Sequence, residues 1–447
     1  MAARAPANWI TVPPKVLPFR ALRFDPARAA TDLANLICPP YDVIAPAEQV
    51  DLAARSPYNA VHLELPIGVA EHKYRQAATD LAAWRERGVL RVDDRPAYYL
   101  SETTFTHAGQ ELTRRDLLAA LQVEPWSNGA VLPHEHTMPG PKADRLELLR
   151  ATRLTASPIW LMHRDQPAAL AAAWSGAVER APDVELTWRG EQHRLWLLDD
   201  PRQVAAIGDD FARGGPLYIA DGHHRYETSL AFRAEAEATL PGAASTMAVL
   251  TWAADPGLVV LPTHRLLRGL DPSFSMEEAE TRWSDVLHIE YFPVWEQTPP
   301  EQIDALMQQL SSNGRNGPAF GLLGLGHIDL FGLLELRGRK PPEGRLPADR
   351  SEAWKSLDVS LLHTLFIDPL IAESGQPRDE VLSFTRDPHQ AFEAVCQGDI
   401  SAAFFLNPTP IEGVLAVADA GDRMPEKSTY FYPKPPAGLV MRALDLA

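Results

Sequence analysis

The sequence has almost no cysteine. Its 447 residues include only Cys38 and Cys396, which are far apart and have no second cysteine close by. Neither a disulfide framework nor a thiolate zinc site is therefore expected, and both side chains are expected to be reduced thiols. Common catalytic and nucleotide-binding signatures are also missing, because the chain has no glycine-rich Walker or Rossmann loop, no Gly-x-Ser-x-Gly elbow and no His-Glu-x-x-His motif.

Long apolar runs and a secretory signal are absent as well. No window holds the roughly 20 apolar residues of a membrane span. The first residues, MAARAPANWITVPP, have neither an apolar core nor a small-residue cleavage site. The sequence therefore predicts a cytoplasmic protein with no membrane partner.

Basic residues are too few to balance the acidic ones. Lys and Arg total 42 against 59 Asp and Glu, which gives a net charge of -17. Such a surface repels phosphate backbones, so no nucleic-acid partner is expected. A locally basic pocket for a small anion such as a nucleotide remains compatible with this charge, because the field in a cleft depends on the nearby groups.

The composition is that of an ordinary globular protein, with 45% hydrophobic and 23% charged residues. The length predicts two domains. We place an N-terminal α/β domain at 1–268, which carries an Asp-Gly-His-His-Arg turn, and a C-terminal α/β region at 269–447, which ends in a Lys-Ser-Thr-Tyr-Phe-Tyr-Pro-Lys-Pro loop. The 40 prolines are spread along the chain and predict rigid loops between regular elements.

The spacing of apolar residues predicts an α/β or mixed α+β sheet protein. A helix is expected over 70–87, and a hairpin over 97–106 and 111–123. Further strands are expected at 60–65, 157–162, 195–198, 217–220, 246–251, 319–323, 327–334, 381–385 and 401–406, and further helices at 275–287, 301–310, 352–372 and 388–397. In the strand at 60–65, His62 and Glu64 would share a polar face that looks either into a site or into water.

The strongest chemical signal is the run Asp221-Gly222-His223-His224-Arg225, where a predicted strand turns into a predicted helix. A helix start offers backbone N–H groups and partial positive charge, and glycine lets a ligand approach the backbone. The histidines and Arg225 add donors that suit a phosphate, while Asp221 is placed to hold a metal ion or accept a proton. A purely structural interpretation would make Asp221 an N-cap and Arg225 a surface ion-pair residue.

A second constellation lies in a loop rich in proline and glycine, which presents His134, Glu135 and His136. A helix is expected to begin near Lys142, with Lys142 and Arg145 in its first turn. Cations oppose the helix dipole there, so we expect an anion between them. A metal site on the two histidines is the weaker alternative.

A third constellation is RMPEKSTYFYPKPPAGL, residues 423–439. It offers Lys427, Ser428, Thr429 and Lys434 as cationic and hydroxyl donors on a segment stiffened by prolines. The segment would either close over a ligand or simply pack its aromatic residues on the body of the protein.

Several stretches together resemble a bacterial and archaeal family known as domain of unknown function 1015. These are PFRALRFDP, CPPYDVI, NAVHLELP, LPHEHTMPGPKADRLELLRAT, ADGHHRYET, PTHR and MPEKSTYFYPKPPAGL, and they span nearly the whole chain. The family label names no reaction.

The Asp-Gly-His-His-Arg turn is also similar, more distantly, to one in the ParB and sulfiredoxin superfamily, especially its free serine kinases. This resemblance implies a ParB/sulfiredoxin-like nucleotide-binding core with a large additional α/β region. It implies an ATP- or ADP-dependent kinase for a small hydroxyl compound, with free L-serine as the leading candidate. By this resemblance Asp221 would be the acid–base or metal-site residue, and His223, His224 and Arg225 would face the phosphates.

Our hypothesis is therefore a metal-assisted phosphoryl transfer from a nucleotide to a small-molecule alcohol, with Mg²⁺ as the expected ion. The site residues assigned to it are Asp221, His223 and Glu135 for catalysis, with Glu64 as a further candidate base; Gly222, His224, Arg225, Lys142 and Arg145 for the nucleotide; His134, Lys427 and Ser428 for the substrate; and Asp221 for the metal. Two alternatives stay open. One is a non-catalytic nucleotide-binding switch, and the other is a metal-dependent hydrolase that uses His134, His136, His223 and His224.

Overall fold

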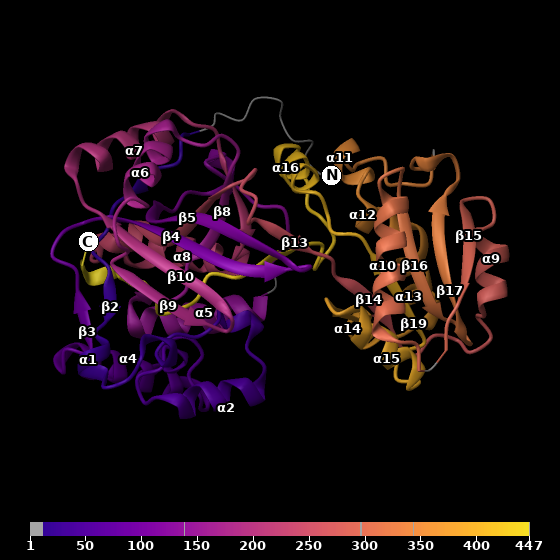
Figure 1. Ribbon diagram of the computed structural model, residues 1–447, viewed down its shortest axis with the longest axis horizontal. Helices are drawn as coiled ribbons and strands as arrows, with labels where there is room; N and C mark the ends of the chain where they lie inside the picture. The colour runs from indigo at the N-terminus through magenta and orange to yellow at the C-terminus, as the bar shows by residue number, and fades with distance from the viewer. Residues whose placement is uncertain (1–11, 138, 296, 343, 447) are drawn as a thin grey trace. The chain divides into compact units, whose positions relative to one another are not determined.

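The computed structural model describes residues 12–446 apart from residues 138, 296 and 343. Its internal contacts divide the chain into two compact units. Of the described residues, 12–133, 137–259 and 431–446 form the larger unit, and 134–136 and 260–430 form the smaller unit. The chain leaves the larger unit at β13 (Val259–Leu261) and returns to it at β20 (Tyr430–Tyr432) (Figure 1).

The expected boundary near residue 268 lies close to the first of these passages, whereas residues 431–446 return to the larger unit instead of staying with residues 269–430. Compact units are defined by contacts and need not be domains that fold alone. The division into 1–268 and 269–447 therefore stays a prediction.

The larger unit is built on a mixed sheet with the strand order β6-β11-β8-β12-β5-β4-β10-β9, and β1 also pairs with β5. The pairs β6–β11 and β8–β12 are parallel, and the other neighbours are antiparallel. The strands are β1 (Val16–Leu17), β4 (Tyr98–His107), β5 (Gln110–Gln122), β6 (Val131–Leu132), β8 (Ile159–His163), β9 (Val184–Trp188), β10 (Glu191–Leu198), β11 (Leu217–Asp221) and β12 (Ser245–Trp252).

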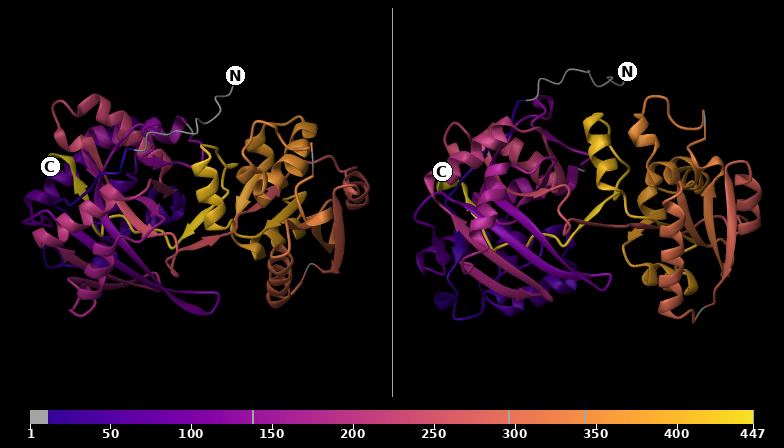
Figure 2. Two further views of the ribbon diagram at one scale, coloured as in Figure 1. Left: turned by 90° about the horizontal axis from the view of Figure 1, so that it is seen from above. Right: turned by 45° about the horizontal axis from the view of Figure 1, so that its top comes forward.

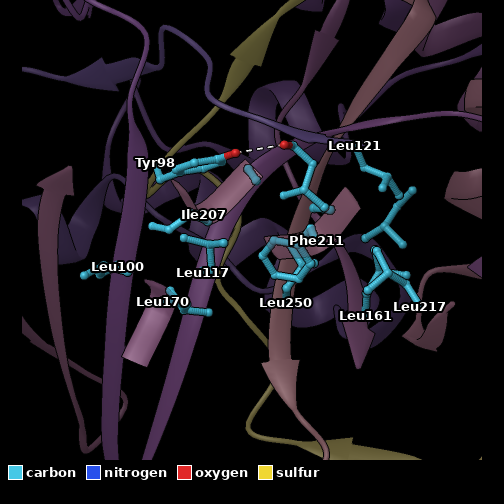
Figure 3. Close-up of a cluster of buried hydrophobic side chains, with 14 of the residues drawn as sticks. Tyr98, Leu100, Leu117, Leu121, Leu161, Leu170, Ile207, Phe211, Leu217 and Leu250 are labelled. Atoms are coloured by element: carbon cyan, nitrogen blue, oxygen red, sulfur yellow. Dashed lines mark hydrogen bonds between the residues drawn. The ribbon is translucent and has the colours of Figure 1, made fainter. Parts of the chain in front are cut away.

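One face of this sheet is covered by α6 (Ala168–Ala177) and α7 (Pro201–Arg213) (Figure 1). Side chains from both helices, among them Leu170 and Phe211, meet alternate residues of the strands in a buried cluster (Figure 3). The cluster also holds Tyr98, whose hydroxyl donates to the Val16 carbonyl over 2.8 Å. The buried polar atom is thereby satisfied inside an apolar core.

The helices that carry the candidate site are α5 (Pro139–Thr152) and α8 (His223–Ala236), which pack against each other, and α4 (Ala70–Glu86) packs on α5. In both views of Figure 2 the end of the chain, coloured yellow, runs among the strands and helices of the larger unit. Shorter elements of this unit are α1 (Pro26–Ala29), α2 (Pro46–Arg55), α3 (Val61–Glu64), the strand pair β2 (Leu22–Phe24) and β3 (Leu90–Val92), and the strand pair β7 (Leu154–Thr155) and β21 (Arg442–Ala443).

The smaller unit is a three-layer arrangement around an antiparallel sheet with the order β15-β17-β16-β19-β14-β18. The strands are β14 (His264–Leu267), β15 (Leu287–Pro293), β16 (Ala319–Gly324), β17 (His327–Leu336), β18 (Leu382–Thr385) and β19 (Ala402–Leu406). One buried cluster joins the sheet to α9 (Met276–Trp283), α12 (Asp358–Leu362) and α13 (Asp368–Ser374), and a separate cluster joins it to α10 (Pro300–Gly314) and α15 (Pro388–Cys396). Alternate strand residues feed the two clusters, as a sheet buried on both faces requires.

The predicted mixed α/β fold is confirmed by both sheets, and the predicted helix over 70–87 and hairpin over 97–123 are confirmed by α4, β4 and β5. Among the described residues, none of the helices combines the length and the apolar character that crossing a bilayer demands.

One predicted element was of the wrong type, and two predicted helices were longer than the helices in the structure. Residues 61–64 form the short helix α3 rather than part of a strand, and the Asn59 side chain accepts from the Val61 N–H over 2.9 Å beside its first residue. His62 and Glu64 therefore do not share a strand face. The helix over 275–287 ends at Trp283, and β15 begins at Leu287. The helix over 352–372 is interrupted: α11 (Glu352–Lys355) stops, α12 follows, and a π-helical turn over His363–Ile367 precedes α13. Pro369 lacks the N–H that a continuous α-helix would use, which accounts for the wider turn before it.

Candidate functional site

The predicted turn lies at the carboxyl end of β11, where Asp221 ends the strand and His223 begins α8. Gly222 between them has φ 98° and ψ 29°, a left-handed conformation that favours glycine. A Cβ atom at this position would also lie 3.1 Å from Arg225 Nε. The first intrahelical bond of α8 runs from the Tyr226 N–H to the Gly222 carbonyl over 2.9 Å. Gly222 therefore allows both the sharp turn and the close approach of the Arg225 guanidinium.

Two cations converge on the Asp221 carboxylate. Its Oδ2 accepts from Arg225, and its Oδ1 accepts from Lys434 Nζ over 2.6 Å. Lys434 also donates to Asp42, so its ammonium group bridges two carboxylates. The Lys434 side chain is only 8% exposed and that of Arg225 only 10%. The four groups form a shielded and charge-balanced cluster, in which Coulomb attraction is stronger than at an open surface.

The pKa directions of this cluster follow from the same contacts. Burial alone would raise the pKa of Asp221, but the charges of Lys434 and Arg225 outweigh it and hold that pKa below its ordinary value. Burial would lower the pKa of Lys434, whereas Asp221 and Asp42 raise it above the ordinary range. Asp221 is therefore ionised and Lys434 is protonated at neutral pH.

The backbone around Lys434 is fixed by a buried arginine. Arg114 is 1% exposed, pairs with Asp116 over 2.8 Å and donates to the Pro433 carbonyl. Its guanidinium lies 4.3 Å from the centre of the Trp160 ring, and Trp160 in turn packs edge-on against Phe431 at 5.8 Å. These contacts hold Phe431 and the Pro433 carbonyl, which precede Lys434 in the chain. They therefore set the position from which the Lys434 side chain extends.

The cations of α5 have protein partners, contrary to the argument from the helix dipole. The helix begins at Pro139 rather than near Lys142, so Lys142 and Arg145 lie further from its positive end than expected. Lys142 donates to Glu227 of α8 over 2.7 Å. Arg145 pairs with Asp144 and donates to the Glu64 carbonyl. Both cations therefore have protein partners, and neither contact requires a bound anion between Lys142 and Arg145.

A small cavity of about 60 Å³ nevertheless joins α5 to α8 beside the turn. Glu64, Arg145, Ser157 and Arg225 form polar parts of its wall, and leucines of α5 and β7 form an apolar part. Glu64 is 4% exposed, and its Oε1 accepts from the Tyr41 N–H over 3.1 Å and from Ser157 Oγ over 2.7 Å. A buried carboxylate and two guanidinium groups therefore share one cavity.

Four of the predicted residues, His134, Glu135, Lys427 and Ser428, belong to the smaller unit. Buried His134 lies 3.1 Å from Thr429 Oγ1 through its Nε2 and 3.9 Å from Glu135 Oε1, and its carbonyl accepts from the Met424 N–H. Ser428 donates to the Pro425 carbonyl over 2.5 Å, so its hydroxyl serves the fold of its own loop. Lys427 is exposed and has φ 53°.

The same loop is fixed within the smaller unit by Arg265. Its Nη2 donates to the carbonyls of Glu426 and Lys427, each over 3.2 Å, and its Nε lies 3.2 Å from His363 Nε2. Arg265 is 1% exposed, and burial lowers its pKa to about 9. The loop that carries Lys427 and Ser428 therefore has a structural anchor of its own.

The histidines of the hydrolase alternative are divided between the units. His134 and His136 belong to the smaller unit, and His223 and His224 to the larger. In the part of the chain that the structure describes, no group of three or more His, Cys, Asp or Glu side chains is arranged to hold a metal ion. The structure therefore adds nothing in favour of this alternative.

The assigned site residues did not include Lys434, Asp42, Glu227 or Arg114. Lys434 lies in the third constellation and Asp42 in the CPPYDVI stretch, but no spacing rule connects positions so distant in sequence. Arg114 sits in a predicted strand beside two further charged residues, where an exposed face is the ordinary expectation. Only the packing of Trp160 and Phe431 reveals its role.

Comparisons with known proteins give one family and several distant structures. No curated protein matches the chain. Among solved structures, a free serine kinase in complex with AMP is 15% identical, with a TM-score of 0.31 over 69% of this chain and 89% of that one. A conserved hypothetical protein from Pyrococcus furiosus is 15% identical, with a TM-score of 0.32 over 71% of this chain and 94% of that one. SbnI with a C-terminal truncation, from Staphylococcus aureus, is 10% identical, with a TM-score of 0.33 over 71% of this chain and 84% of that one.

The family comparison is more extensive. The model described as "Protein of unknown function (DUF1015)" matches residues 16–360, which include the turn at Asp221 and most of the predicted motifs. This confirms the resemblance found in the sequence, and the chain belongs to the DUF1015 family of proteins of unknown function.

Proposed function

We propose that the larger unit binds a nucleoside di- or triphosphate at the turn between β11 and α8 and transfers its terminal phosphoryl group to a small hydroxyl compound. The observation that carries this proposal is the convergence of Arg225 and Lys434 on Asp221 at the start of a helix. Phosphoryl transfer is mostly positioning and charge stabilisation. Shielded cations beside a helix N-terminus supply both.

The cluster is suited to an exchange of partners. Lys434 is held between Asp42 and Asp221 by contacts that a phosphate oxygen can replace, because phosphate and carboxylate oxygens accept the same ammonium hydrogen bonds. The two carboxylates are hard oxygen donors, and Mg²⁺ commonly takes one or two carboxylates together with substrate phosphates and water. Asp221 and Asp42 therefore fit a Mg²⁺ ion, which when bound would neutralise charge on the transferred phosphoryl group.

We assign the metal-site role to Asp221 and the proton-accepting role to Glu64. A carboxylate whose pKa is held low by two cations is a poor base. Glu64 is instead oriented by the Tyr41 N–H and the Ser157 hydroxyl, and it lines the cavity shared with Arg145 and Arg225. The acceptor oxygen would form a bond to phosphorus as the bond from phosphorus to the nucleotide oxygen breaks, and the acceptor proton would pass to Glu64.

The acceptor assigned to this reaction is a small hydroxyl compound, with free L-serine as the first candidate. A small polar ligand is supported by the lining of the cavity, which mixes one carboxylate, two guanidinium groups and hydroxyls. Such a lining pairs with an ammonium group and a carboxylate on the same molecule. His134, Glu135, Lys427 and Ser428 lie in the smaller unit and have no role in this proposal.

The test is to incubate the full-length protein with MgCl₂, ATP or ADP, and a panel of hydroxyl amino acids and sugars, and to follow the products by ³¹P NMR. A phosphorylated acceptor is expected. Arg225→Met should lower its rate by about 100-fold or more, whereas Lys355→Met, in the smaller unit and outside the site, should leave it unchanged. Nucleotide binding without consumption would overturn the transfer step and favour a nucleotide-binding switch, and the absence of both binding and product would overturn the whole proposal.

A further inference from the structure

The larger unit has another pocket, of about 330 Å³, that none of the residues of the Asp221 turn lines. Its wall includes apolar side chains from the beginning, the middle and the end of the chain, such as Leu17, Ala120 and Leu446. It also includes Arg20, Ser245 and Arg442. The volume lies within the usual range for small-molecule sites.

Arg442 is the unusual residue of this wall. It is 4% exposed, yet among the described residues its guanidinium bonds only to uncharged oxygens. Nη1 and Nη2 donate to the Gly242 carbonyl over 3.2 and 3.1 Å, Nη1 to the Ser245 carbonyl over 2.8 Å, and Nη2 to Ser245 Oγ over 2.8 Å. Burial lowers the pKa of Arg442 to about 10. A buried charge is normally paired with an opposite one, because desolvation is otherwise uncompensated.

A second guanidinium lines the same pocket without a counter-charge. Half-buried Arg20 donates from Nε to the Asp93 carbonyl over 2.9 Å. Within the described part of the chain, neither Arg20 nor Arg442 forms an ion pair, and none of the residues lining the pocket carries a carboxylate. The pocket therefore combines two uncompensated positive charges with an apolar wall.

We propose that this pocket binds a small organic carboxylate with an apolar body. A carboxylate would supply the missing negative charge, and its hydrocarbon part would cover Leu17, Ala120 and Leu446. Four of the five N–H groups of Arg442 are already used by protein oxygens, so only Nε–H remains for the ligand. A singly charged group that needs few donors suits this pocket better than a phosphate, which requires many.

The proposal is tested with the full-length protein carrying ¹³C-labelled leucine and alanine methyl groups, titrated with sodium octanoate. Octan-1-ol, which has the same apolar chain and no charge, is the matched ligand. We expect saturable shifts of the Leu17, Ala120 and Leu446 methyl signals with octanoate. Octan-1-ol should bind at least about tenfold more weakly, because it cannot form a charge-assisted bond.

Two variants separate binding from folding. Arg20→Gln changes a half-buried side chain and should weaken octanoate binding at least about tenfold with the fold intact. Arg442→Met should abolish binding, although it also removes bonds to Gly242 and Ser245. Arg28→Gln on α1, outside the pocket, is the matched control and should bind as the unaltered protein does. The proposal would be overturned by equal affinity for octanol and octanoate, by signal shifts only elsewhere in the protein, or by full octanoate affinity in Arg20→Gln. None of these outcomes depends on nucleotide binding.

Discussion

Lys434 Nζ lies 2.6 Å from Asp221 Oδ1, although 213 positions separate the two residues in sequence. The same ammonium group reaches Asp42, which lies 392 positions away. The contact thus joins three remote parts of the chain at the start of α8. Its removal should affect both stability and ligand binding, in ways that can be separated.

Lys434→Met should lower the free energy of unfolding by about 3 kcal/mol, because it removes the cation of Asp42 and leaves Asp221 with Arg225 alone. Urea unfolding would measure the change. Adding Asp42→Asn to this variant should cost less than the sum of the two single changes, since the residues interact directly. Strict additivity would contradict the bridged arrangement. Lys355→Met, whose ion-pair partner Glu352 is exposed, should stay within about 0.5 kcal/mol of the unaltered protein.

Gly222→Ala should destabilise the protein by about 1–2 kcal/mol, because alanine disfavours the φ of 98° and its Cβ would lie 3.1 Å from Arg225 Nε. Thermal unfolding would measure the loss. Gly222→Asn tolerates positive φ better and should cost less through the backbone. An alanine variant as stable as the asparagine variant would show that the left-handed turn is not required.

Gly257→Ala should be more damaging, by about 3 kcal/mol, because the new Cβ would lie 2.4 Å from the Arg114 backbone nitrogen and 2.5 Å from the Thr113 carbonyl carbon. Backbone atoms of a central hairpin cannot easily move aside. Gly176→Ala is the matched change: Gly176 lies in α6, where an added Cβ meets nothing within 4 Å. There alanine should stabilise by about 0.5–1 kcal/mol, and a ranking of the two variants in the opposite order would refute this packing.

Asp358→Asn should make the protein more stable at pH 8 but not at pH 4. Burial raises the pKa of Asp358 to about 7, partly offset by the Ala319 N–H. The unfolded chain releases this proton near pH 4, so between about pH 4 and 7 the folded state holds the extra proton and stability falls as pH rises. We expect the free energy of unfolding of the variant, relative to the unaltered protein, to rise by about 2–4 kcal/mol across this range. Urea unfolding at several pH values would measure it. A difference that does not change with pH would refute the raised pKa.

The parts of the fold that could be predicted are those that depend on local spacing. The helix at 70–87 and the strands around the Asp221 turn follow from apolar periodicity and from glycine at the turn. The short helix at 61–64 could not be predicted in this way, because its apolar residues alternate as in a strand and the bond from the Val61 N–H to Asn59 leaves no trace in that pattern. The interruption before Pro369 follows from one missing N–H, which a pattern of apolar residues does not register.

The candidate site shows the same limit at longer range. The sequence indicated the Asp-Gly-His-His-Arg turn, because its five residues are consecutive. It also indicated the segment after residue 423 as a source of cations, but favoured Lys427 over Lys434. The choice between these lysines depends on where the chain returns to the larger unit, between Tyr430 and Phe431, and that passage is set by packing of Phe431 on Trp160. Such tertiary contacts leave no local signature.

The return of the chain to the larger unit also sets the order in which the protein can mature during synthesis. Lys434 follows Asp221 by 213 residues. At ordinary rates of translation the ribosome needs about 10 to 40 s to add them. During that interval the nascent turn holds Arg225 but not its second cation. A truncated product that stops after the smaller unit would therefore carry every residue of the Asp-Gly-His-His-Arg motif and still lack the bridged carboxylates.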